Sequence, residues 1–171
     1  MKVGTKSVLF GYHQFLIHPW FVALAWWKLY GFPFDPRLWV AFFVHDLGYF
    51  GKPNMDGPEG TRHPILGGHI MDRLFGKDWY LFTLCHSRHY AKSTGMSHSR
   101  LCVADKLAFA ITPYWLCKLQ AYASGEIHEY MRAAGTTTFR QWHGIVKAHM
   151  RNWVTEHADG REDTWTQARE A

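Results

Sequence analysis

The apolar run at residues 38–44 ends in two adjacent polar residues, His45 and Asp46. Burying an imidazole and a carboxylate together is unfavourable unless they pair with each other or hold a cation. A helix that carries this run into a core must therefore bring both polar groups to partners on other parts of the chain. This requirement constrains the fold more than any other feature of the sequence.

Other side chains with metal-ligating chemistry occur in order on separate segments. They are His18, His63, His86 and Asp105. Facing helices of a bundle build metal centres in this way, each contributing a ligand. With His45 and Asp46 they make six nitrogen and oxygen ligands without a thiolate, which suits Mn, Fe, Co, Ni or Zn, with Mg at a second position. We therefore expect two divalent ions, with Asp46 bridging them.

The first ligand position stays open between His18 and His13. Proline biases the residue before it away from the helical conformation, so His18 before Pro19 can act as a simple helix-capping residue. Helical spacing from His18 to Val22 and Ala25 favours an inward position for His18. We expect His18 to be the ligand.

Prolines and N-cap residues lie at the start of a series of segments, and glycines follow their ends. This pattern predicts helices throughout the chain. The expected helices span residues 19–30, 37–47, 64–76, 79–93, 97–112 (starting at Ser97 or Ser99), 114–122, 125–134 and 138–156. No segment sustains the alternation of a strand. The predicted fold class is all-α, a single-domain helical bundle over residues 1–157 with a polar tail at 158–171.

Residues 48–62 contain four glycines and two prolines, which predicts an ordered loop or lid between two helices. The chain has 171 residues, enough for one domain with a substantial core. Its three cysteines are an odd number without close pairing. This favours buried thiols in a reducing compartment, and we expect a cytoplasmic protein.

The longest apolar stretch, residues 15–27, is interrupted by His18 and Pro19 and is shorter than the ~20 residues of a membrane span. We expect no membrane span and no signal peptide, although the aromatic density of this stretch permits peripheral contact with lipid. The net charge of +5 favours an anionic partner. Because the basic residues form no long run, we do not expect extended nucleic-acid binding. The oligomeric state is not encoded in any pattern.

The ordered ligands resemble those of the HD-domain superfamily of metal-dependent phosphohydrolases. The superfamily places His, His-Asp and Asp on separate helices of an all-α bundle, and His18, His45-Asp46 and Asp105 look like this set. The local sequences agree, with Val-Ala at 22–23, Leu-Gly at 47–48 and Val-Ala-Asp at 103–105. The resemblance covers residues 13–112 and implies an HD-type bundle.

Two further segments resemble the binuclear branch of that superfamily, which includes the HD-GYP cyclic-dinucleotide phosphodiesterases. His63-Pro-Ile-Leu-Gly67 looks like its His-Pro-x-x-Gly helix start, and His86-Ser87 lies where the branch has a His-His pair. The chain departs from the pattern in having Tyr49 in place of a lysine and Ser87 in place of the second histidine. It also has no Gly-Tyr-Pro motif, which argues against cyclic-dinucleotide hydrolysis.

We expect catalytic roles for Asp46, Tyr49 and His89. Asp46 would orient or bridge the ions, and Tyr49 would donate a hydrogen bond to the substrate. His86 and His89 are three residues apart and would share one face of the expected helix 79–93. His86 would then bind metal while His89 acts as an acid or base.

An anionic substrate needs cationic side chains around it, and the region near His86 and the 48–62 loop supply them. Arg88 and Lys92 are four residues apart and can act as an anion clamp, with a solvated basic face as the alternative. Lys52 and Arg62 lie in the loop and could close over the anion. The predicted substrate-binding residues are Arg88, Lys92, Lys52 and Arg62.

The resemblance implies hydrolysis of a phosphate ester or anhydride in a small phosphorylated substrate by a metal-activated water. Two alternatives stay open. The same ordered ligands resemble those of the di-iron HD oxygenases, which use O₂. A module that senses a nucleotide or lipid through a retained metal site is the third interpretation.

Overall fold

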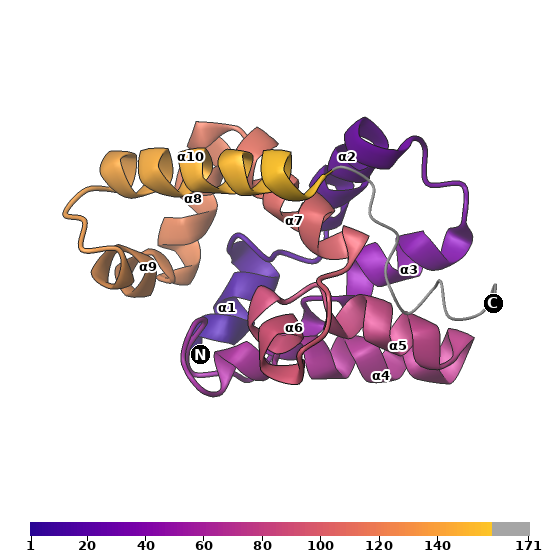
Figure 1. Ribbon diagram of the computed structural model, residues 1–171. Coiled ribbons are helices and arrows are strands. Elements are labelled where there is room, and N and C mark those ends of the chain that lie inside the picture. The colour runs from indigo at the N-terminus through magenta and orange to yellow at the C-terminus, as the bar shows by residue number, and fades with distance from the viewer. Residues whose placement is uncertain (159–171) are drawn as a thin grey trace.

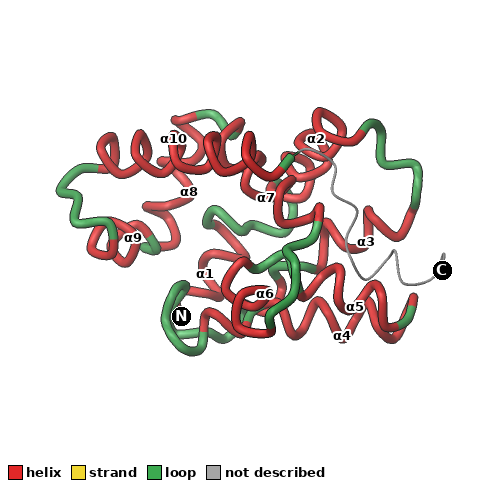
Figure 2. The backbone as a smooth tube through the Cα atoms, viewed as in Figure 1, coloured by secondary structure: helices red, strands yellow, loops and turns green. Residues whose placement is uncertain are grey.

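The computed structural model describes residues 1–158, which form ten α-helices and two short 3-10 helices (Figure 1). No strand occurs in this part of the chain (Figure 2), so the fold is all-α as predicted. In chain order the elements are α1 (Val3–Phe10), α2 (His18–Tyr30), α3 (Pro36–Val44), η1 (Leu47–Tyr49), η2 (Gly60–Arg62), α4 (Pro64–Phe75), α5 (Lys77–Leu84), α6 (Arg88–Thr94), α7 (Arg100–Ile111), α8 (Tyr114–Ser124), α9 (Ile127–Ala133) and α10 (Phe139–His157). Residues 159–171 of the predicted polar tail lie outside the described residues.

Capping side chains begin α3 and α7 where the sequence predicts them. The predicted cap at Asp78 is wrong, because α5 begins one residue earlier, at Lys77, without a side-chain cap. Asp35 accepts a hydrogen bond from the backbone N of Arg37 at 2.9 Å, and Pro36 occupies the first turn of α3. Ser99 caps α7 through the backbone N of Cys102. Each side chain satisfies an amide that the helix itself leaves unpaired.

Helix α7 runs through the centre of the bundle and packs against α2 and α10 (Figure 1). Eight of its twelve residues are buried, and they include Asp105. The main core lies between α2, α3, α4, α5 and α7, with Trp26, Phe42 and Leu101 among its buried side chains. A second core joins α7 to α8, α9 and α10 around Ile127 and Trp142. The larger of the cavities described below is lined by Tyr12, Phe109 and Trp142 of this second core.

The three cysteines, Cys85, Cys102 and Cys117, are buried, as predicted, and form no disulfide with one another. Burial raises the pKa of the Cys102 and Cys117 thiols to about 12. Among residues 1–158 no helix has the length and apolar character needed to cross a membrane.

The helix boundaries differ from the prediction in three places. Helix α1 was not predicted, and its N-cap residue Lys2 makes no side-chain capping bond that the sequence could reveal. The predicted helix 79–93 is wrong, because the chain leaves the helix after Leu84 and Ser87 caps a new one, α6. The predicted helix 37–47 ends earlier, at Val44, so His45 and Asp46 lie in the turn that follows α3.

Candidate metal centre

Three histidines of the predicted ligand set share one local arrangement. The Nδ1 atom of each lies within hydrogen-bond distance of the backbone carbonyl three residues earlier. These pairs are His45 with Phe42 at 2.9 Å, His63 with Gly60 at 2.8 Å, and His86 with Thr83 at 2.6 Å. A carbonyl only accepts, so Nδ1 must carry the proton. In the neutral ring Nε2 then presents a lone pair, as a metal ligand requires.

A first group of ligand atoms comes from α2, the turn after α3, and α7. His18, His45, Asp46 and Asp105 are buried, and each offers an atom within 4.8 Å of the others. His18 Nε2 lies 3.0 Å from Asp105 Oδ1, and His45 Nε2 lies 3.1 Å from Asp46 Oδ2. Four ligand atoms from three segments therefore surround one position.

A second group consists of Asp46, His63 and His86, which are also buried and mutually within 4.8 Å. Asp46 Oδ1 lies 3.3 Å from His86 Nε2 and 3.6 Å from His63 Nε2. The two oxygens of Asp46 are thus divided, with Oδ2 facing the first group and Oδ1 facing the second. A carboxylate placed in this way would offer one oxygen to a metal ion in either group.

The donor set fits divalent metal ions. His45 Nε2 and Asp46 Oδ2 are buried without a hydrogen-bond partner among the described residues. The Nε2 atoms of His63 and His86 lie only 3.1 Å apart, although each ring already donates through Nδ1. Two lone pairs at that distance repel unless a cation lies between or beside them, and buried polar atoms are rarely left unpaired.

Electrostatics keep His63 and Asp46 in the protonation states that metal binding needs. Burial lowers the pKa of His63 well below its usual value, and the neighbouring His86 imidazole lowers it further. Burial alone would raise the pKa of Asp46, but the imidazoles of His45 and His13 outweigh it and hold this pKa well below its usual value. His63 is therefore a neutral ligand and Asp46 an ionised one.

Two glycines bring the ligand-bearing segments into backbone contact. A Cβ on Gly48 would lie 1.9 Å from the His63 carbonyl oxygen, and one on Gly67 would lie 2.5 Å from that of Val44. Any larger residue would separate α4 from the turn that holds Asp46. Both glycines belong to the sequence patterns that pointed to the site.

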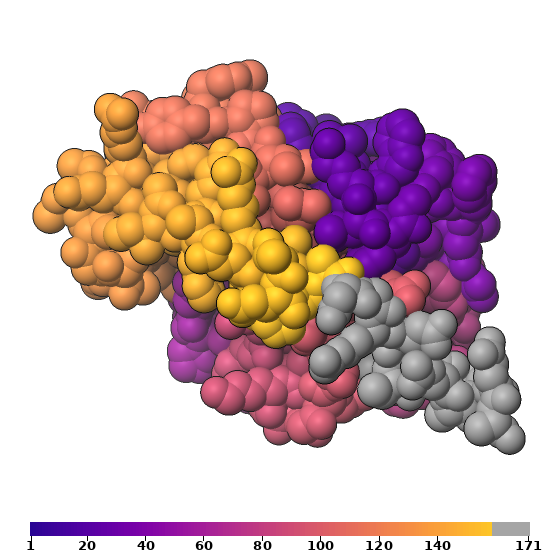
Figure 3. Space-filling view, turned by 45° about the horizontal axis from the view of Figure 1, so that its top comes forward, coloured from indigo at the N-terminus to yellow at the C-terminus, as the bar shows by residue number. Residues whose placement is uncertain are grey.

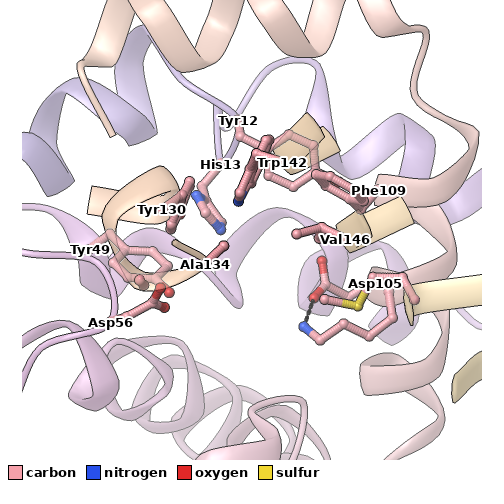
Figure 4. Close-up of a pocket in the computed structure, with 13 residues that line it drawn as sticks. Tyr12, His13, Tyr49, Asp56, Asp105, Phe109, Tyr130, Ala134, Trp142 and Val146 are labelled. Atoms are coloured by element: carbon pink, nitrogen blue, oxygen red, sulfur yellow. Dashed lines mark hydrogen bonds and ion pairs between the residues drawn. The ribbon is translucent and has the colours of Figure 1, made fainter. Parts of the chain in front are cut away.

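A cavity of about 150 Å³ lies over the second group and is lined by Asp46, His63 and His86. It adjoins a cavity of about 420 Å³ walled mainly by aromatic side chains (Figure 4). Five residues line both spaces: His13, Tyr49, Asp56, Asp105 and Lys106. In Figure 4, His13 and Trp142 reach toward the middle of the larger cavity, with Asp56 and Asp105 on opposite sides.

His13, the alternative first ligand, lies outside both ligand groups. Its Nδ1 atom is 2.9 Å from Ser7 Oγ and 3.5 Å from the buried carboxylate of Glu126. Burial opposes the charged imidazole, but Asp46 and Glu126 outweigh it and raise the pKa of His13 to about 9. His13 therefore presents a positive charge to both cavities.

The predicted catalytic residues lie at different distances from the centre. Tyr49 is buried and stacks on the His63 ring, with ring centroids 4.0 Å apart. Burial raises the pKa of Tyr49 well above its usual value, so its hydroxyl remains a donor. His89 is exposed, lies in the first turn of α6 and lines the smaller cavity. Since His86 precedes α6, the two histidines do not share a helix face as predicted.

The predicted anion-binding residues are also scattered. Arg88 lines the smaller cavity, but its guanidinium packs over the Trp153 ring at 4.9 Å. Lys92 lies on the exposed side of α6, Arg62 is exposed and Lys52 is half-buried. These three do not line the cavities described here.

Two charged groups of the site are not among the predicted site residues. Lys106 lines both cavities and places Nζ 2.7 Å from Asp105 Oδ2, and Asp105 raises the pKa of Lys106 against the opposing effect of burial. Glu126 is fully buried and holds His13 from the start of α9. The adjacency of Lys106 to Asp105 was a usable signal, whereas nothing near Glu126 distinguishes it from a solvated acid.

The fold and site together define an all-α protein with a buried His/Asp cluster that can hold metal ions. Comparison of the chain with protein-family models, curated proteins and solved structures finds no match in any of the three. The site itself is therefore the basis for any functional conclusion.

Proposed function

We propose that the protein is an HD-type, metal-dependent phosphohydrolase that cleaves a phosphate ester or anhydride. The observation that carries this proposal is the division of the Asp46 carboxylate between two histidine-containing ligand groups. Paired divalent ions in such groups would activate a water molecule and neutralise charge that develops on phosphoryl oxygens. The ordered resemblance to HD-type enzymes supports the same conclusion.

The cationic side chains over the centre favour an anionic substrate. His13 and Lys106 line both cavities, and Arg88 lines the smaller one. Ammonium and guanidinium groups bind phosphate oxygens through charge-assisted hydrogen bonds. Tyr49 lies between His13 and His63 and can donate its hydroxyl to the same anion.

The larger cavity favours a substrate with an organic group of substantial size. Its volume of about 420 Å³ falls within the ordinary range for small-molecule pockets. Tyr12, Phe109, Tyr130 and Trp142 wall it, and the rings of Tyr130 and Trp142 are parallel to within 2°. A flat or apolar group would pack there while its phosphate reaches the ligand groups.

The test is hydrolysis by the purified full chain after its metal content has been measured. With Mn²⁺ or Co²⁺ supplied, it should release phosphate or alcohol from at least one member of a panel of nucleotides, aryl phosphates and alkyl phosphates. Asp46→Asn should abolish this activity, while Glu156→Gln on the exposed side of α10 should retain it.

The alternatives give different results in the same preparation. Iron-rich protein that consumes O₂ and leaves every phosphate intact would identify an oxygenase and refute the proposal. A chain that melts at higher temperature with a phosphorylated ligand, but turns over neither substrate class, would identify a sensor.

A further inference from the structure

Helix α2 carries a stripe of large apolar side chains that the fold leaves exposed. Trp20 is 58% exposed, Leu24 39% and Trp27 56%. Their spacing of four and three residues places them on one face of the helix, and Leu16 extends the line by one turn before the helix begins. The opposite face of α2 is buried against α7, so the stripe is held rigidly outward.

The segment after α2 continues the stripe. Phe32 is 48% exposed and Phe34 85% exposed. The Trp27 and Phe32 rings lie 5.9 Å apart, and the Phe32 and Phe34 rings 4.9 Å apart. We call this surface the aromatic face; it consists of Leu16, Trp20, Leu24, Trp27, Phe32 and Phe34. Single exposed apolar residues are ordinary, but a contiguous patch of this kind marks an interaction surface.

The charged residue of the segment that forms the aromatic face, residues 16–34, is Lys28, and the carboxylate that follows, Asp35, pairs with Arg37 at 2.6 Å. The first acidic residue of the chain is Asp35, so all 14 carboxylates lie in residues 35–171. The first 34 residues contain Lys2, Lys6 and Lys28. Lys28 is exposed on α2 next to Trp27. The surface therefore combines exposed indole and phenyl rings with cationic charge and carries no carboxylate of its own segment.

We propose that the aromatic face seats the protein on the surface of an anionic membrane. Indole and phenyl rings favour the boundary between headgroups and acyl chains, and a lysine beside them can reach lipid phosphates. Because α2 is already folded against α7, binding incurs no cost of helix formation. This inference stands independently of the proposed phosphohydrolase activity.

A second copy of the chain fits the face less well than lipid does. In a twofold dimer the same patch meets itself, so the interface would hold two Lys28 ammonium groups and no carboxylate from residues 1–34. An anionic headgroup supplies the missing charge. The indigo and purple part of the chain that includes α2 lies at an outer edge of the molecule (Figure 3), which suits contact with a broad surface.

The experiment is co-sedimentation of the full chain with vesicles made of equal parts phosphatidylcholine and phosphatidylglycerol, compared with phosphatidylcholine alone. Wild type should bind the anionic vesicles more tightly. The double variant Trp27→Ser with Phe34→Ser should bind them at least about tenfold more weakly, because each ring lost removes apolar area from the contact. Ile145→Ser, which removes a 57% exposed side chain from α10, is the matched control and should bind like wild type.

Three results would overturn the proposal. Wild type could fail to bind the anionic vesicles, or the double variant could bind them as wild type does. Light scattering could instead show a wild-type dimer that the double variant converts to a monomer, with no vesicle binding by either. Circular dichroism melts verify that the variants are folded, so that weaker binding is not mistaken for unfolding.

Discussion

Replacing Asp46 should remove both metal ions, whereas replacing a ligand of one group should remove one. Asp46 belongs to both ligand groups, and His63 belongs only to the second. An ion that binds only the folded state stabilises it by about 2.7 kcal/mol when its free concentration is about 100 times its Kd. Two such ions would contribute about 5 kcal/mol, on the assumption of similar affinity.

The assay is urea unfolding of each protein with and without Mn²⁺, so that every variant serves as its own reference. We expect Mn²⁺ to raise the free energy of unfolding by about 5 kcal/mol in wild type, about 2.7 kcal/mol in His63→Gln and close to zero in Asp46→Asn. Metal analysis after gel filtration should find two bound ions in wild type, one in His63→Gln and none in Asp46→Asn. Glu156→Gln controls for removal of an exposed carboxylate from α10.

This comparison can refute the shared-carboxylate geometry without reference to any enzymatic activity. If Asp46→Asn kept one ion and half of the Mn²⁺-dependent stabilisation, Asp46 would serve a single group. If His63→Gln lost both ions, the two groups would not be separable sites.

Three further predictions concern packing and specificity. Glu126→Ala should lower the free energy of unfolding by about 3 kcal/mol in urea titrations, because a buried hydroxyl and a backbone amide lose their acceptor; Glu156→Ala should change it by less than about 0.5 kcal/mol. Gly67→Ala should destabilise the fold by about 1–3 kcal/mol and weaken Mn²⁺ binding in calorimetry, since its methyl group meets backbone, whereas Gly144→Ala, with open space around it, should do neither. Val146→Trp should fill the larger cavity and lower kcat/KM for an aryl phosphate by about tenfold while sparing a small alkyl phosphate; equal losses for both substrates would contradict the assignment of that cavity to the organic group.

The sequence predicted the buried His/Asp cluster because the chemistry of its members is local and repeated. Each ligand lies in a segment that apolar spacing or a proline already marks as the edge or interior of a helix, as with His63 before Pro64. Asp105 is buried because α7 is apolar around nearly its whole circumference. In an all-α bundle, residues in such segments are buried in the interior.

The rest of the site depends on contacts between residues far apart in the chain. Glu126 reaches Ser7 across 119 residues, and Glu129 accepts from the backbone N of Met55 across 74. Trp142 and Tyr130 wall the larger cavity from a region without a recognisable motif. Periodicity and capping describe one element at a time, so they cannot show which element covers which.

The break in the predicted helix 79–93 has a physical cause that links fold to site. Phe42 and Thr83 lie in the last turns of α3 and α5, where the regular helical partners of the backbone carbonyls run out. The Thr83 carbonyl accepts instead from the backbone N of His86, at 3.3 Å. The imidazoles of His45 and His86, placed just past those ends, donate Nδ1–H to these carbonyls. The same hydrogen bond closes the helix and fixes the ring with Nε2 toward Asp46. A histidine in the middle of a helix would find its neighbouring carbonyls already paired and would keep a free choice of rotamer and tautomer. His45 and His86 therefore lie in turns, because a helix end can both accept the proton and aim the lone pair.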